Sequence, residues 1–120
     1  MSDAASMLKL NVRDGFGVAV LHIGKITGHE AETISGELKQ AAEASSSRLI
    51  LDMRHVMMIA SAALGSLIST QKQCAAAGGT LTLVELSPDL KQLLKITNLH
   101  KVIPVADDMA SAEARVLKGA

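Results

Sequence analysis

Aromatic side chains and cysteine are almost absent from this chain. Phe16 is the only aromatic residue, because the sequence has neither Trp nor Tyr. Proteins that bind single-stranded nucleic acid stack the bases on aromatic rings, and this chain lacks such a platform. Cys74 is the only cysteine, which excludes a disulfide within the chain and fits a reducing compartment.

The chain also lacks an excess of charge of either sign and any long apolar run. Its 12 basic and 12 acidic side chains cancel, and no stretch of Lys or Arg would follow a phosphate backbone, so we expect no nucleic-acid partner. No segment approaches the roughly 18 unbroken apolar residues that span a membrane, so we expect no membrane insertion. Residues 1–10 lack the basic and apolar regions of a secretory signal, and we therefore expect a cytoplasmic location.

The apolar content of the chain is sufficient for one hydrophobic core. Of its 120 residues, 48% are hydrophobic and 20% are charged, close to the average of soluble globular proteins. A chain of this length supports one core rather than two separate domains. We expect a single domain over residues 1–120, in which residues 1–6 form a flexible N-terminus.

Short apolar segments alternate with amphipathic segments along the chain. Two β-branched segments flank Asp14-Gly15, a pair suited to a tight turn, and predict a hairpin. Apolar residues that recur every three or four positions predict helices, and short apolar runs predict strands. The predicted strands are 7–12, 17–23, 48–53, 80–86 and 101–105, and the predicted helices are 30–42, 62–77, one that starts at Pro88 and one that follows Asp107 and Asp108.

This order of elements predicts an α/β fold. Repeated strand-helix-strand units favour parallel pairing with right-handed crossovers, so we expect a mixed, mostly parallel sheet with an N-terminal hairpin and about four helices. If the strands are added in one direction, each crossover places its helix on the same face of the sheet. The expected result is a two-layer fold.

No group of residues has the spacing of a catalytic or metal site. His29 begins "HEAET", which starts like a zinc-protease helix motif but lacks the second histidine one turn later. The four histidines lie on separate predicted elements, and none lies at helical spacing from Cys74 to activate its thiol. We therefore expect no enzyme activity, no metal and no cofactor, and a packing role for Cys74.

Ser61 stands out because it lies among small and apolar residues, where an apolar stretch ends and a helix begins. One interpretation is structural, since a hydroxyl at this position caps a helix and contributes roughly 1 kcal/mol. The other is regulatory. A phosphate at a helix N-terminus is tolerated locally, but it would bring about −1.5 to −2 charges onto a neutral surface and could reject a partner bound there.

From Leu49 onward the sequence resembles the STAS domain, a module of bacterial anti-sigma factor antagonists and sulfate-transporter tails. The resemblance rests on "LILDMRHVMMIASAALGSLISTQKQCAAAGGTLTLVELSPDLKQLLKITNLHKVIPV". In the family, a strand, a serine loop, a helix, a Gly-Gly pair, a strand, a helix that starts with Ser-Pro and a closing strand follow in this order. Ser61 falls on the serine that is phosphorylated in antagonists, and Gly78, Gly79, Ser87 and Pro88 also match.

The resemblance implies a partner-switching regulator of bacterial signal transduction. The unmodified domain would capture an anti-sigma factor that is a serine kinase, and phosphorylation of Ser61 by that kinase would end the capture. A PP2C-type phosphatase would restore it. The resemblance places the partner-binding surface on the loop "GKITGHE" and on the serine loop with the helix after it, where Ser66 and Ser69 should face outward. The implied partner-binding residues are Thr27, His29, Ala60, Ala62, Ala63, Leu64, Gly65, Ser66 and Ser69.

Two alternatives remain open at this point. Ala60 and Thr27 stand where the family commonly has acidic residues, which favours a STAS scaffold that binds a partner constitutively in a transport or stress-signalling complex. A small enzyme or ligand carrier is the third class, and only the isolated histidines would support it.

Overall fold

The computed structural model describes residues 7–118, so the predicted flexible segment at 1–6 lies outside the described residues. A four-stranded sheet has the order β1-β2-β4-β6, in which β1 and β2 are antiparallel and the other neighbours are parallel. Gly15 takes a φ of 85° in the turn between β1 and β2, a conformation that glycine adopts without a steric penalty. The four strands are β1 (Leu8–Arg13), β2 (Phe16–Leu21), β4 (Arg48–Asp52) and β6 (Thr80–Val84).

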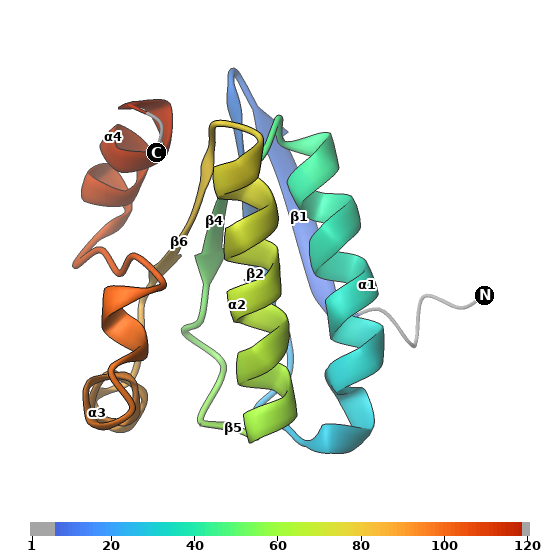
Figure 1. The fold of residues 1–120 in the computed structure, drawn as a ribbon, viewed down its shortest axis with the longest axis vertical. Helices are drawn as coiled ribbons and strands as arrows, with labels where there is room; N and C mark the ends of the chain where they lie inside the picture. The colour runs from blue at the N-terminus through green and yellow to red at the C-terminus, as the bar shows by residue number, and fades with distance from the viewer. Residues whose placement is uncertain (1–6, 119–120) are drawn as a thin grey trace.

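Helices α1 (Gly28–Ala44) and α2 (Ser61–Ala76) lie side by side over one face of this sheet (Figure 1). Because successive side chains of a strand point to opposite faces, alternate residues of the central strands face these helices. They form the main core with the apolar stripes of the helices, including Ile34 and Leu38 of α1 and Leu67 of α2. The strand residues on this face are Ala19, Leu21, Leu49, Leu51, Leu81 and Leu83.

The opposite face of the sheet is covered by α4 (Met109–Lys118). Ile50 and Val84 alternate with the residues of the main core and pack against Ala112 and Val116 of α4. The expected two layers are therefore present in the sheet with α1 and α2, and α4 adds a short third layer. This layer forms because the central strands are apolar on both faces and water would otherwise contact Ile50. Helix α3 (Pro88–Ile96) completes the four helices of residues 7–118.

Most of the predicted strand at 101–105 does not form. Asn98, two residues after the end of α3, has a φ of 61°. The residues after it, Leu99–Lys101, form a 3₁₀ turn instead of a strand. Only Val105 makes a β-bridge, with Leu83 of β6, through the Pro104 carbonyl and the Ala106 amide. Pro104 has no amide hydrogen to donate to a ladder, which explains why the pairing stops after one bridge.

Candidate functional site

Ser61 is the first residue of α2, and its side chain is exposed. The N-cap is Ala60, whose backbone has the extended conformation of a cap with φ −81° and ψ 160° and whose side chain makes no cap hydrogen bond. The prediction that Ser61 caps the helix is therefore wrong by one residue. Within residues 7–118 the exposed Ser61 hydroxyl makes no hydrogen bond, so it is free to contact solvent or another molecule.

A second, two-stranded sheet joins the two loops that the resemblance implicates. Strands β3 (Lys25–Ile26) and β5 (Met58–Ile59) are parallel neighbours, and Lys25 lies opposite Met58. The Ala60 amide donates a hydrogen bond to the Ile26 carbonyl over 2.7 Å. Because β3 leads directly into Thr27 and β5 leads into Ser61, these pairings bring the starts of α1 and α2 to one surface. The sequence patterns did not predict this small sheet.

Thr27 is held by a capping box at the start of α1. The His29 amide donates to Thr27 Oγ1 over 3.2 Å, while the Thr27 amide and hydroxyl donate to Glu30 Oε1 over 2.7 and 2.6 Å. These hydrogen bonds, that of the hydroxyl first, lower the pKa of the Glu30 carboxyl from its ordinary value, because they favour the charged form. The Thr27 side chain is therefore committed to the helix start, and the neighbouring His29 is exposed.

The predicted partner-binding residues differ in their access to solvent. Thr27, His29, Ala62, Gly65 and Ser69 are exposed, and Ala60 and Leu64 are half-buried. The expectations for Ala63 and Ser66 need correction.

Ala63 is 1% exposed because its methyl group belongs to the core between α2 and the sheet, so its side chain cannot contact a partner. Ser66 does not face outward. It is half-buried against α1, and its hydroxyl lies 3.4 Å from the Ala31 and Ala62 carbonyls. Both errors arise because helical spacing shows which residues share a face but not that α1 packs along this side of α2.

Two methionines beside Ser61 were missed by the sequence analysis. Met57 and Met58 are 62% and 55% exposed, whereas Val56 and Ile59 on either side of them are buried. The sequence contains no signal for this exposure, because four consecutive apolar residues in "VMMI" do not show which of them point inward. Exposed Met side chains are flexible and polarizable and suit protein-binding surfaces.

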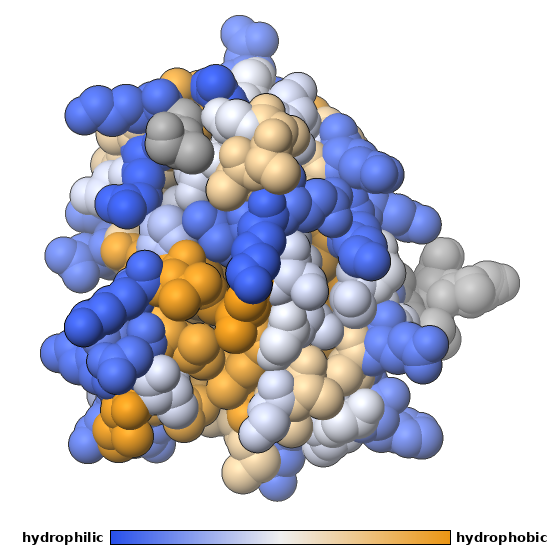
Figure 2. Space-filling model, in the orientation of Figure 1, coloured by the Kyte–Doolittle hydropathy of each residue, from blue (hydrophilic) through white to orange (hydrophobic). Residues whose placement is uncertain are grey.

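An apolar area lies between α2 and α3. Leu64 of α2 and Leu93 of α3 are both half-buried and line the same shallow depression. Figure 2 shows this apolar area between α2 and α3, bordered by polar residues. We call the surface formed by residues 24–29, 57–58, 60–62 and 64–65 the serine-loop surface.

The segment that leads from β4 to the serine-loop surface is anchored by a buried carboxylate. Asp52 is 2% exposed and accepts hydrogen bonds from the Arg54 amide over 2.9 Å and from Arg54 Nε over 3.0 Å. Arg54 Nη2 completes the ion pair at 2.9 Å. The hydrogen bonds to the Asp52 carboxylate raise the pKa of the Arg54 guanidinium further, because they favour its charged form.

The remaining candidates for chemistry give no catalytic arrangement. Cys74 is buried, and desolvation raises the pKa of its thiol to about 11, as suits a packing residue rather than a nucleophile. His22 and His55 lie in the loops that follow β2 and β4, outside any helix or strand, and their rings stack with centroids 5.0 Å apart. Among residues 7–118, no three His, Cys, Asp or Glu side chains gather as metal ligands would. The same part of the chain holds no helix long and apolar enough to cross a bilayer.

Comparison with known protein families gives one match over most of the chain. The STAS domain family model matches residues 8–112. Among individual proteins, BtrV of Bordetella bronchiseptica, which is assigned as an anti-sigma factor antagonist, is 29% identical over 107 residues. That alignment covers 89% of this chain and 91% of BtrV.

Solved structures of anti-sigma factor antagonists have the same fold. The crystal structure of one from Mycobacterium paratuberculosis superposes with a TM-score of 0.79 at 20% identity and covers 97% of this chain and 98% of that protein. The antagonist SpoIIAA in its unphosphorylated form gives a TM-score of 0.67 at 16% identity, covering 94% of this chain and 99% of SpoIIAA. Bacillus SpoIIAA has also been solved in a phosphorylated form.

Proposed function

Because the chain belongs to the STAS domain family, we propose that it is a bacterial anti-sigma factor antagonist whose capture of its partner is switched by phosphorylation of Ser61. The partner would be an anti-sigma factor of the serine-kinase type, and the reversal would be carried out by a PP2C-type phosphatase in the cytoplasm. Members named as antagonists are relatives of this chain over about nine-tenths of its length. The chain acts by binding and is not an enzyme.

The observation that carries this proposal is the free, exposed hydroxyl of Ser61 at the start of α2. A kinase must bring the γ-phosphate of ATP to this oxygen, which requires that no neighbouring residue covers it. The exposed Ala62 and Met58 leave it accessible on a mostly apolar surface. One related protein, SpoIIAA, has structures in both phosphorylation states, and this supports a switch of the same kind here.

The physical effect of the phosphate would be local. The N-terminus of α2 has unpaired amides and the positive end of the helix dipole, so a dianion there does not unfold the helix. A partner that packs against Met57, Met58 and Ala62 would, however, bury that dianion. Burial of an unmatched charge costs several kcal/mol, which exceeds a regulatory coupling of about 1 to 3 kcal/mol. Phosphorylation would therefore release the partner while the fold persists.

The test is phosphorylation by the kinase encoded nearest to this gene, followed by intact-mass and peptide-mass analysis. We expect one phosphate on Ser61 and none on the Ser61→Ala variant. Ser69→Ala is the matched control, because Ser69 is an exposed serine on the same helix, and it should be phosphorylated as the unaltered chain is. A phosphate located only on another residue, or none at all in the presence of an active kinase, would contradict the switch.

A second function is favoured by the chemistry around Ser61. Ala60 has no carboxylate that could orient a kinase, and the Thr27 oxygen is occupied by the capping box. These features fit a scaffold that binds its partner constitutively in a transport or stress-signalling complex. The Ser61→Asp variant separates the two functions in a pull-down with the partner. Loss of binding by a folded variant supports the switch, and retained binding supports the scaffold.

A further inference from the structure

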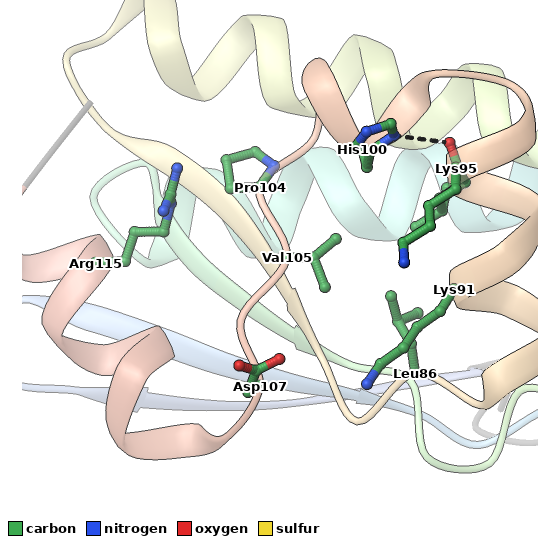
Figure 3. A pocket seen from close by; sticks show the side chains of 9 residues that line it. Leu86, Lys91, Lys95, His100, Pro104, Val105, Asp107 and Arg115 are labelled. Carbon is green, nitrogen blue, oxygen red and sulfur yellow. Dashed lines mark hydrogen bonds between the residues drawn. The ribbon is translucent and has the colours of Figure 1, made fainter.

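A separate hollow lies on the α3 side of the molecule, and the residues that line it include none of the serine-loop surface. It has a volume of about 400 Å³ and lies between α3, the connection after β6 and the segment around Pro104 that leads to α4. This volume is within the range of roughly 300 to 1,000 Å³ that is usual for small-molecule sites. Figure 3 shows that its side chains come from segments distant in sequence.

The floor of the hollow is apolar. Leu86 and Leu94 are 8% and 3% exposed and belong to the main core, and the half-buried Val105 packs against that core. These side chains are held by packing, since Leu86 is buried in the main core and Val105 is fixed by its bridge to Leu83. A ligand would therefore meet a preformed apolar surface and would not have to order a loop.

The rim of the hollow is cationic. Lys91 and Lys95 are one turn apart on α3, a spacing that places them on the same face of the helix. In Figure 3 the side chains of Lys91 and Lys95 extend from α3 toward Leu86 and Val105. Two like charges at this spacing weaken a helix slightly, and within residues 7–118 neither lysine forms an ion pair. The fold therefore gains no salt bridge from them.

Two further groups complete the charge pattern. Arg115 of α4 lines the other side of the hollow, and Asp107 is the one acid among the lining residues. Lys91, Lys95 and Arg115 against the one acid give the lining two positive charges in excess, although the whole chain has a net charge of 0. The His100 ring is oriented by a 3.2 Å contact between its Nδ1 and the Leu94 carbonyl, which leaves Nε2 available to a ligand.

We propose that this cationic hollow binds a small organic anion, with one phosphate or carboxylate group on a short apolar body. The amines of Lys91 and Lys95 would hold the anionic group as mobile point charges, and Leu86 and Val105 would cover the apolar body. The excess positive charge excludes cationic ligands, and the apolar floor favours an organic anion over inorganic phosphate.

The test is a titration of the isotope-labelled chain followed by amide NMR shifts, at constant ionic strength. The probes are phenyl phosphate, phenylacetate, inorganic phosphate and phenol. We expect saturable shifts at residues 86–95 and 104–107 with phenyl phosphate or phenylacetate, whichever has the preferred anionic group. Inorganic phosphate and phenol should each bind at least about fivefold more weakly, because each lacks one half of the recognised chemistry.

The Lys91→Gln/Lys95→Gln variant keeps the helix and removes both charges. Its affinity for the best probe should fall by about five- to thirtyfold, as expected for the loss of two exposed ion pairs. Lys72→Gln on α2 is the matched control and should leave the affinity unchanged. Equal loss in both variants, or no saturable shift with either organic anion, would overturn the proposal. Ser61→Asp should bind the probe normally, so a failure here says nothing against the switch at Ser61.

Discussion

The amide of Ala60 donates a hydrogen bond to the carbonyl of Ile26 over 2.7 Å and so joins the loop before α1 to the loop before α2. The two residues belong to segments more than thirty positions apart in the sequence, yet this bond and the β3–β5 pairing place Thr27 and Ser61 at one surface. The two helix starts on this surface differ: α1 has a complete capping box, and α2 has a cap without a polar side chain.

Ala60→Ser should stabilise the protein. Ala60 has the backbone conformation of an N-cap but offers no oxygen to the free amides of α2, and a serine at a cap is worth about 0.5 to 2 kcal/mol over alanine. We expect an increase of about 1 kcal/mol in the free energy of unfolding by urea. Ala62→Ser, one residue beyond Ser61, serves as the control and should not stabilise. An unchanged or lower midpoint for Ala60→Ser would contradict the assignment of the cap.

Thr27→Ala should destabilise the protein by about 1 kcal/mol, because it removes the cap of α1 and the hydroxyl that donates to Glu30. Thr27→Ser keeps the oxygen and should lose much less. Urea unfolding monitored by circular dichroism measures both. If the two variants lost equal stability, the methyl group rather than the hydroxyl would be responsible.

Glu30 should make the free energy of unfolding depend on pH. Hydrogen bonds from Thr27 lower the pKa of the Glu30 carboxyl in the folded state. The contribution of Glu30 to the free energy of unfolding is therefore complete above its ordinary pKa of about 4.3, and it is lost as the pH falls through the lowered folded value. We expect Glu30→Gln to lose less stability between neutral and acidic pH than the unaltered chain. Glu32→Gln, an exposed acid on the same helix, provides the comparison. Identical pH profiles for Glu30→Gln and the unaltered chain would refute this contribution.

Met57→Asp should abolish most partner capture without a change in stability. Met57 is 62% exposed in the segment that leads to Ser61, and a charge there would have to be desolvated on the apolar surface of a bound partner. We expect the affinity for the proposed anti-sigma factor partner to fall at least about tenfold, since 1.4 kcal/mol corresponds to a factor of ten. Ile96→Asp changes an apolar residue that is 72% exposed on α3 and should bind normally. If both variants bound with the same affinity, the partner would have to contact a surface other than the serine-loop surface.

Gly79→Ala should be strongly destabilising. A Cβ atom at Gly79 would collide with the backbone carbonyl of Ser47, which cannot move aside without breaking the pairing at the start of β6. Overpacking of this kind costs about 1 to 3 kcal/mol. At Gly36, within α1, an added Cβ meets nothing within 4 Å, so Gly36→Ala should be neutral or stabilising in thermal unfolding. A neutral Gly79→Ala would show that β6 can shift.

Much of the fold could be predicted because its signals are local. The Asp14-Gly15 pair lies in the turn of the predicted hairpin, and Ser87 with Pro88 begins α3 as expected, with the Leu90 amide bonded to Ser87 Oγ. The closing helix also follows Asp108, whose carboxylate accepts from the Ser111 amide. Each of these features depends on residues within about four positions of one another, and such contacts can be inferred from spacing alone.

The site could be predicted only in part, because its decisive contacts are distant in sequence. The motif resemblance located Ser61, but helical periodicity could not show that Ser66 packs against α1 or that Ala63 is buried. Nor could it show that Met57 and Met58 are exposed beside the serine.

The sequence by itself determined the α/β class, the order of the four helices and of strands β1, β2, β4 and β6, and the position of Ser61 at the beginning of a helix, since propensity and hydrophobic period act within a few residues. Only the tertiary structure decided which loops meet at that serine, that α4 covers the second face of the sheet, and that Lys91 and Lys95 share one hollow with Arg115. These relationships depend on packing among segments far apart in the chain, where the shape of the assembled core, and not any local pattern, sets which side chains meet.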